Sequence, residues 1–127
     1  MLSTQTEEQI REVLNRYVSL YEKRDIEAIL QLFAPDIMCF GKARDDIILN
    51  KAACEQQFRW DFERVGTLSL QMSNCTIKAE GTISWVMGDL TIAVDTLVFP
   101  CRFTMVLRGT GHRWEIVQMH FSLADRE

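Results

Sequence analysis

Apolar residues recur every three or four positions through the first half of the chain, and this spacing predicts three amphipathic helices. The first is expected to start at a capping box over residues 6–9, and its apolar stripe comprises Ile10, Val13, Leu14, Tyr17, Leu20 and Tyr21. The second begins near Asp25, carries Phe33 and ends at Pro35. The third has Asn50 as its N-cap and is closed by Gly66.

Alternation of apolar and polar residues replaces helical spacing in the second half, and it predicts strands. Short strands are expected at residues 37–40 and 47–49, on either side of a polar loop over residues 41–46. From residue 68 the alternation is regular until its phase changes after Asn74, which predicts a β-bulge. A long strand is expected from Ile83 to Val94, followed by a turn at Asp95-Thr96. Helices followed by a strongly curved antiparallel sheet predict an α+β domain whose helices cover the concave face.

Two runs rich in β-forming residues meet across Gly109-Thr110-Gly111, which predicts a closing hairpin. Its polar positions share one face and are Arg102, Thr104, Gln118, His120 and Ser122. The apolar positions on the other face are Phe103, Met105, Leu107, Val117, Met119 and Phe121. We predict that the polar set lines a small-molecule pocket beneath the helices, and that a partner subunit covers the apolar set.

The composition is that of an ordinary globular protein with a single domain over residues 1–127, since apolar residues make up 47% and charged residues 25%. A net charge of −4 argues against partners such as nucleic acid or anionic membrane. The N-terminus has neither the basic start nor the apolar run of a signal peptide. We therefore expect a cytoplasmic protein.

The cysteines and histidines do not follow the spacing of a metal site. The four cysteines, at positions 39, 54, 75 and 101, form no Cys-x-x-Cys pair, and only two histidines are present. Free and mostly buried thiols are the expected state. No phosphate loop or dinucleotide motif occurs, so we expect no metal and no cofactor.

Residues 100–107 and 114–122 carry an Arg-x-Thr pattern and a Trp-x-Ile-x-x-x-His-x-Ser pattern. Together with Ser84-Trp85-Val86 they resemble the SnoaL-like branch of the superfamily named for nuclear transport factor 2 and ketosteroid isomerase. The resemblance implies a cone-shaped, cystatin-like α+β barrel, a deep pocket between helices and sheet, and frequently a homodimer through the outer sheet faces. The superfamily includes isomerases, cyclases, dehydratases and non-catalytic partners, so the fold leaves the function open.

At two positions this chain lacks an acidic residue that members of the resembling families carry. Ketosteroid isomerases carry an aspartate base about where this chain has Phe40-Gly41. Many SnoaL-like relatives carry an acidic residue two positions after the central tryptophan, where this chain has Met87. Neither proton-transfer arrangement is therefore carried over to this chain.

His120 is the candidate acid–base residue, because an imidazole titrates near neutral pH, and its alternative is a structural role. Arg102 is a candidate anchor for a ligand carboxylate. Asp89 is a candidate internal partner for Arg102 and a second catalytic candidate. The alternatives for Arg102 are a salt bridge that only fixes the cone, or a place at the dimer interface. The resemblance to ketosteroid isomerase makes Tyr17 a candidate donor to a ligand carbonyl.

Large apolar side chains supply the predicted walls of the pocket, although core packing accounts for each of them as well. They are Phe40, Trp60, Trp85 and Met87. The acidic pair Asp45-Asp46 is expected in the loop at the mouth.

Two functions of different classes follow from these residues. The first is binding of a small carbonyl- or carboxylate-bearing organic molecule, with cofactor-free isomerisation, cyclisation or dehydration by proton transfer. In it Arg102 would anchor the polar end, Thr104 and Gln118 would orient it, and His120 would move the proton. The alternative is a non-catalytic dimerisation or association domain with a vestigial pocket. A homodimer is expected under both.

Overall fold

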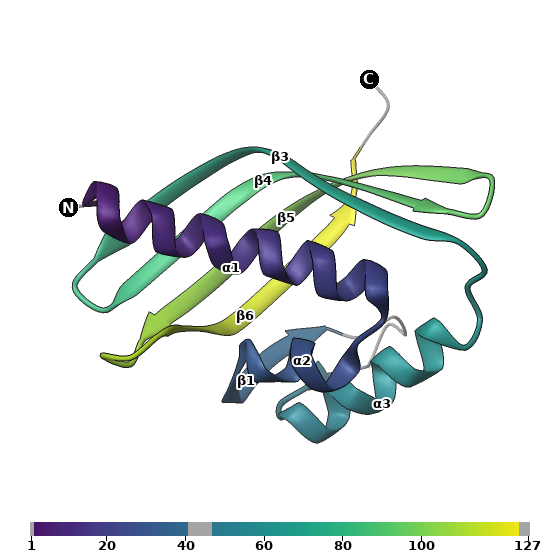
Figure 1. Cartoon of the computed structure of the whole chain (residues 1–127), viewed down its shortest axis with the longest axis horizontal. Helices are drawn as coiled ribbons and strands as arrows, with labels where there is room; N and C mark the ends of the chain where they lie inside the picture. The colour runs from purple at the N-terminus through teal and green to yellow at the C-terminus, as the bar shows by residue number, and fades with distance from the viewer. Residues whose placement is uncertain (1, 41–46, 125–127) are drawn as a thin grey trace.

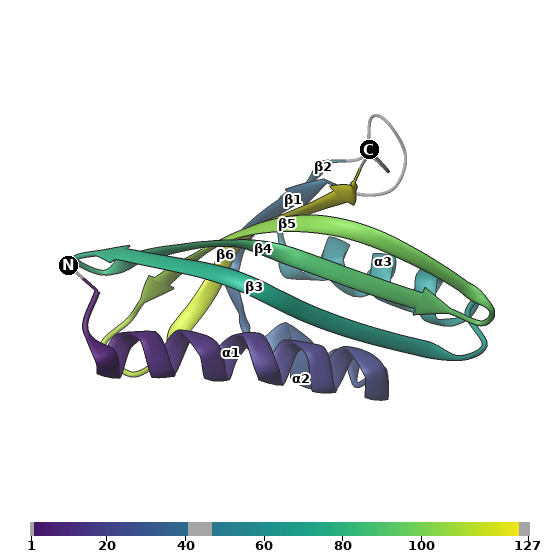
Figure 2. The same ribbon diagram turned by 90° about the horizontal axis from the view of Figure 1, so that it is seen from above.

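The structure of the chain is a computed structural model that describes residues 2–40 and 47–124. Helices α1 and α2 lie along one face of a curved, six-stranded sheet, with α3 beside the strand β1 (Figures 1 and 2). The predicted loop over residues 41–46, with Asp45 and Asp46, lies outside the described residues. None of the described helices is both long and apolar enough to cross a membrane.

Helix α1 spans Thr4–Lys23 and starts before the predicted capping box. Ser3 is the N-cap, and its hydroxyl accepts a hydrogen bond from the Thr6 backbone N–H at 3.1 Å. Thr6 therefore lies within the first turn. The stripe that includes Ile10, Leu14 and Tyr17 is buried against the sheet as its spacing predicts.

Helix α2 spans only Ile26–Gln31, after the N-cap Asp25, and the predicted extension through Phe33 was wrong. The Leu32 carbonyl accepts a hydrogen bond from the Ile116 N–H at 2.9 Å, and this contact leads the chain into strand β1, Phe33–Phe40. Pro35 lies within β1 where its pairing is irregular, so its missing N–H is tolerated.

Helix α3 spans Lys51–Phe62 and begins as predicted, since the Asn50 side chain accepts a hydrogen bond from the Ala53 N–H at 2.9 Å. It ends at Phe62 with Glu63 as its C-cap, so Gly66 does not close it. The guanidinium of Arg24 holds this end by donating to the carbonyls of Phe62, Val65 and Gly66. A cation from the α1–α2 turn thus caps the carbonyl end of α3 and fixes its position.

The sheet is completed by β2 (Ile47–Ile48), β3 (Leu68–Glu80), β4 (Ile83–Val94), β5 (Leu97–Gly109) and β6 (Trp114–Leu123). The strand order is β2-β1-β6-β5-β4-β3. Strand β1 pairs in parallel with β6, and the other pairs are antiparallel. The α+β cone is confirmed, but its sheet is mixed and not closed.

Local features of the long strands confirm the predicted bulge, turn and hairpin. The β3–β4 register shifts between Ser73 and Thr76, and Asn74 there has a φ of 53°. Asp95 turns β4 into β5 with a φ of 55°. The closing hairpin pairs Gly109 with Trp114. These features bend the sheet around the helices.

The inner face of the sheet, toward the helices, carries most of the predicted apolar set together with Ile116, whereas Val117 is the extra residue at a register shift and Phe121 is 44% exposed. Its residues on β5 and β6 are at most 7% exposed and are Phe103, Met105, Leu107, Ile116 and Met119. Arg102, Thr104 and Gln118 are exposed on the outer face, so the predicted orientation of the hairpin was wrong. The reason is that the helices present apolar stripes to the sheet, and only the apolar alternate positions can pack against them.

An ion-pair cluster joins β1, β5 and β6 at the edge of this core. Arg108 contacts the Asp36 carboxylate at 2.8 Å and Glu115 at 3.8 Å, and Arg113 contacts Glu115 at 2.9 Å. Glu115 is 8% exposed. Two guanidiniums therefore compensate a carboxylate that the fold has removed from water.

Candidate functional site

An apolar cavity of about 590 Å³ lies between the helices and the inner face of the sheet. Helices α1 and α3 supply Tyr17, Tyr21, Cys54, Gln57, Phe58 and Asp61. Strands β1 and β2 supply Phe33, Ile37, Cys39, Phe40 and Ile48, and β4 to β6 supply Ile92, Phe99, Cys101, Met119, His120, Phe121, Ser122 and Leu123. Most of these side chains are hydrocarbon or aromatic, so the cavity favours an apolar ligand.

A set of aromatic rings forms the helix side of the cavity. The spacing of Tyr17 and Tyr21 on α1 brings their rings to a centroid distance of 5.7 Å. Tyr17 stacks on Phe33 at 6.4 Å, and Tyr21 meets Phe62 edge to face at 5.1 Å. Phe58 stacks on Phe62 at 5.7 Å. These mutual contacts fix the ring orientations before any ligand enters.

Both phenols in this wall keep their protons well above neutral pH. Burial raises the pKa of Tyr17 well above its ordinary value, with smaller contributions from neighbours that include Asp61. Burial and the Asp61 carboxylate raise the pKa of Tyr21 to about 12. A protonated phenol is a hydrogen-bond donor, so Tyr17 is placed to donate to an oxygen atom in the cavity.

Asp61 and Gln57 are polar residues of the cavity that the sequence reasoning missed. The Gln57 amide donates to the Asp61 carboxylate at 3.0 Å, and both belong to α3. Counted from Cys54, residues 57, 58 and 61 follow at helical i+3, i+4 and i+7 positions. That spacing was the signal that could have placed Asp61 beside Phe58.

Four predicted site residues line this cavity: Tyr17, Phe40, His120 and Ser122. His120 and Ser122 are exposed near the end of β6, and the strand register pairs them with Thr104 and Arg102 of the outer face, so they border the cavity only at its rim. The His120 imidazole meets the Phe40 ring edge to face, with a centroid distance of 5.6 Å. The ligand-binding and acid–base roles of these residues stay predictions.

The other predicted site residues do not line the cavity. Arg102, Thr104, Gln118, Trp85, Met87 and Asp89 project from the outer face of β4 to β6. Asp89 lies opposite Arg102 in the strand register and accepts a hydrogen bond from the Asn74 amide at 2.8 Å. Trp60 is exposed on α3, with the Arg64 guanidinium 3.9 Å from its ring centroid. Arg102 and His120 therefore do not converge inside the hollow.

The described residues gather no group of three or more histidine, cysteine, aspartate or glutamate side chains that could hold a metal ion. The functional groups that the lining residues bring to the cavity are phenols, thiols, an amide, a carboxylate, an imidazole and a hydroxyl.

A model of the SnoaL-like domain matches residues 10–126, which is nearly the whole chain. The chain belongs to the SnoaL-like family. None of the curated proteins compared with it matches.

Solved structures share the fold of this SnoaL-like domain. An NTF2-like protein of unknown function from Pseudomonas putida KT2440 is 22% identical, with a TM-score of 0.89, 100% of this chain covered and 93% of that chain. A candidate dehydratase of the NTF2-like family from Streptomyces avermitilis is 13% identical, with a TM-score of 0.87 and 97% and 99% covered. A candidate aromatic ring hydroxylase from Novosphingobium aromaticivorans is 14% identical, with a TM-score of 0.87 and 98% and 93% covered. At these identities the likeness shows the fold alone.

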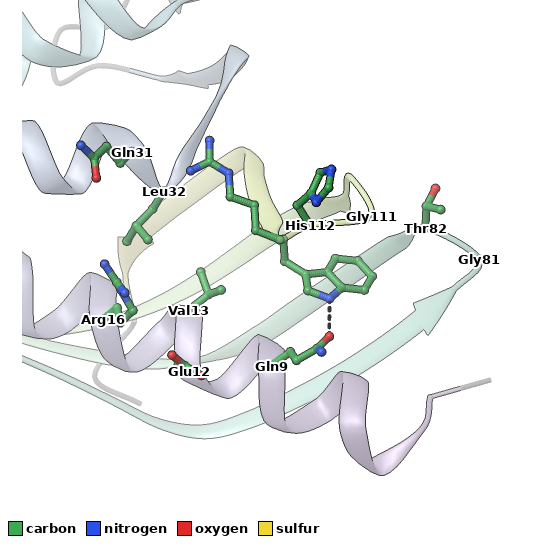
Figure 3. Close-up of a pocket in the computed structure, with 13 residues that line it drawn as sticks. Gln9, Glu12, Val13, Arg16, Gln31, Leu32, Gly81, Thr82, Gly111 and His112 are labelled. Carbon is green, nitrogen blue, oxygen red and sulfur yellow. Dashed lines mark hydrogen bonds between the residues drawn. The ribbon is translucent and has the colours of Figure 1, made fainter.

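The SnoaL-like domain has a second hollow, of about 520 Å³, where α1 faces the tips of the hairpins (Figure 3). Gln9, Glu12 and Arg16 project into it from α1, opposite the turn that holds His112. The Trp114 indole N–H donates to the Gln9 side-chain oxygen at 2.9 Å and ties β6 to α1. Exposed polar side chains and turn glycines make up much of its lining, so the apolar cavity between the helices and the sheet is the better ligand site.

Proposed function

We propose that this SnoaL-like domain binds, in the apolar cavity, a small and partly apolar organic molecule that carries a carbonyl group. The proposal rests on the side chains that form the wall of this cavity. Stacked aromatic rings surround the Tyr17 phenol, which stays protonated, and Asp61 lines the same space. Such a site provides hydrocarbon contact together with a donor for one oxygen atom.

The lining supports a neutral carbonyl over a carboxylate. Among the described residues that line the cavity there is no arginine and no lysine, whereas Asp61 contributes a carboxyl group. A ligand carboxylate would enter an apolar space in which the described lining residues offer no cationic partner. The anion anchor expected from Arg102 is on the outer face, so the carboxylate alternative loses its support.

The chemistry that these groups support is proton transfer without a cofactor. In the proposed reaction the Asp61 carboxylate removes a proton from the carbon next to the ligand carbonyl. The Tyr17 hydroxyl donates a hydrogen bond to the carbonyl oxygen and stabilises the enolate that forms. His120, at the mouth, is the second acid–base candidate. Isomerisation, cyclisation and dehydration all use such a step, and one structural neighbour is a candidate dehydratase.

The test is deuterium exchange into 1-indanone, a cyclic ketone with exchangeable protons beside its carbonyl, followed by NMR in D₂O. The wild-type protein should accelerate the exchange, and Asp61→Asn should slow it by about 100-fold or more. Tyr17→Phe should slow it as well, because the enolate loses its donor. Arg102→Ala is the matched control and should exchange at the wild-type rate. No acceleration by the wild type, or an unchanged rate in Asp61→Asn, would contradict the proposed chemistry.

We also propose association of two copies of the domain through the outer sheet face. Large apolar side chains remain exposed there, including Trp85 at 43%, Met87 at 62% and Met38 at 48%. Asp89 and Arg102 flank them on neighbouring strands. A patch with both charges suits an isologous contact, in which two-fold symmetry brings opposite charges together.

Sedimentation of the purified wild type should give the mass of a dimer, and Met87→Glu should give a monomer. Asn15→Glu, at an exposed position of α1 on the other side of the sheet, is the control and should remain dimeric. A monomeric wild type at every concentration tested would contradict the association and would leave the cavity proposal intact.

A further inference from the structure

The second hollow, between α1 and the tips of the hairpins, has cationic side chains and an indole in the same lining (Figure 3). Arg16 lines it from α1, Arg113 from the turn between β5 and β6, and Trp114 from the first position of β6. Its volume of about 520 Å³ is within the range of small-molecule sites. The hollow thus combines two guanidiniums with an aromatic ring, whereas the described lining residues of the apolar cavity include no arginine.

The Trp114 indole is held in a fixed position beside this space. Its N–H donates to the Gln9 side-chain oxygen at 2.9 Å. Three atoms of its six-membered ring lie 3.4–3.5 Å from the point that a Cβ atom of Gly109 would occupy, so the ring lies against its partner residue on β5. Trp114 is half-buried and lines the hollow, so part of the ring stays open to it. A ring that is already held needs little further ordering when a ligand packs on it.

The two guanidiniums differ in how far the fold already engages them. Arg113 donates to the Glu115 carboxylate at 2.9 Å, and Arg108 lies 3.8 Å from the same carboxylate. Arg16 is exposed, and among the described residues no hydrogen bond or ion pair engages its guanidinium. Glu12 is the one carboxylate among the described residues that line the hollow, so the lining carries a positive excess in a chain whose net charge is −4. Arg16 is therefore available to an anion from solution.

We propose that this hollow is a second ligand site, one that binds aromatic carboxylates. The ligand carboxylate pairs with Arg16 and is attracted by Arg113, because a planar guanidinium matches the two oxygen atoms of a carboxylate. The ligand ring packs against the Trp114 indole. The inference goes beyond the proposed function, since it concerns another site and a ligand class for which the apolar cavity offers no cationic partner among its described lining residues.

The other groups of the hollow narrow the class of ligand. Val13 and Leu32 add hydrocarbon to the lining and favour a ligand with an apolar ring over a small inorganic anion. Glu12 repels negative charge, and it repels a phosphate dianion more strongly than a carboxylate monoanion. A singly charged acid with an aromatic ring system meets both conditions.

The experiment is an NMR titration of the isotopically labelled protein with 2-naphthoate, followed through the indole N–H resonance of Trp114. That resonance should shift saturably, and Arg16→Gln should weaken binding about fivefold or more, because the carboxylate loses its partner. Arg102→Gln removes an exposed arginine of the outer sheet face and is the matched control, with wild-type affinity expected. Glu12→Gln should tighten binding about twofold, because it removes the like charge.

Two further measurements separate a guanidinium–carboxylate pair from simple ring packing. The neutral analogue 2-naphthamide should bind about tenfold more weakly than 2-naphthoate. Arg16→Lys keeps the charge without the planar fork, so its affinity should fall between those of the wild type and Arg16→Gln. Circular dichroism verifies that each variant folds.

Wild-type affinity in a folded Arg16→Gln would overturn the proposal, as would equal affinities of the wild type for the acid and the amide. If Arg16→Gln does not fold, the comparison of acid and amide decides. A titration that leaves the Trp114 resonance unmoved, or that shifts Tyr17 and Phe58 of the apolar cavity instead, would also overturn it. Failure of 1-indanone to bind the apolar cavity would contradict the proposed function and leave this inference intact.

Discussion

The two faces of β5 differ in what covers them, and this difference organises the molecule. Phe103, Met105 and Leu107 are each at most 2% exposed beneath the helices. Arg102 and Thr104, which alternate with them, are exposed on the outer face. On β5, residues of one parity therefore lie in the core beneath the helices, and residues of the other parity lie on an outer surface that a second protein can contact. The layer packed on a sheet therefore decides which chemistry is open to each face.

The largest expected contrast is in stability. Leu107→Ala removes a fully buried side chain from the inner face and should lower the free energy of unfolding by about 2–5 kcal/mol. Thr104→Ala, on the outer face of the same strand, should change it by about 0.5 kcal/mol or less. Urea unfolding followed by circular dichroism measures both. Equal losses would show that the two faces are not covered differently.

The second expected effect is on the stability of the fold at alkaline pH, where the Tyr21 phenol of the cavity wall titrates. The pKa of Tyr21 is raised from its ordinary 10.0 to about 12, so between these values the folded state holds a proton that the unfolded state has lost. The corresponding stability, roughly 2–3 kcal/mol, is fully present below pH 10 and is lost as the pH rises toward about 12. Unfolding measured across this range should show the loss, and Tyr21→Phe should reduce it. A Tyr21 phenol that titrates near 10 would contradict the burial of the wall.

The smallest expected effect belongs to the exposed pair of Asp36 and Arg108. The Arg108 guanidinium lowers the pKa of Asp36, so the carboxylate stabilises the fold above the ordinary aspartate value. That contribution should disappear as the pH falls through the lowered pKa. Asp36→Asn should therefore flatten the acid limb of the stability profile slightly and leave the neutral region little changed. Superimposable profiles for wild type and variant would show that the pair contributes nothing.

The sequence predicted the elements of this sheet well, because strand alternation and turn residues are local signals. Strand β4 has its predicted bounds, and the bulge near Asn74 and the turn at Asp95 occur as expected. The end of the second helix was wrong because Pro35 was read as its terminator, whereas parallel pairing with β6 draws Phe33 into a strand.

Which face of the sheet meets the helices could not be predicted from alternation. Both faces of β4 carry apolar residues, Trp85 and Met87 on one and Val86 and Leu90 on the other. The polar residues of the last hairpin were assigned to the pocket, and only packing against the helices shows that Arg102 is outside.

The most direct test of the ligand site is NMR mapping of 1-indanone on the assigned, uniformly labelled protein. The shifts of Tyr17, Phe58 and Met119 should change saturably with ketone concentration, while those of Arg102 and Thr104 on the outer face and of Arg16 in the second hollow should not. Saturable changes centred on the outer face or on the second hollow, with the cavity residues unmoved, would contradict the ligand site.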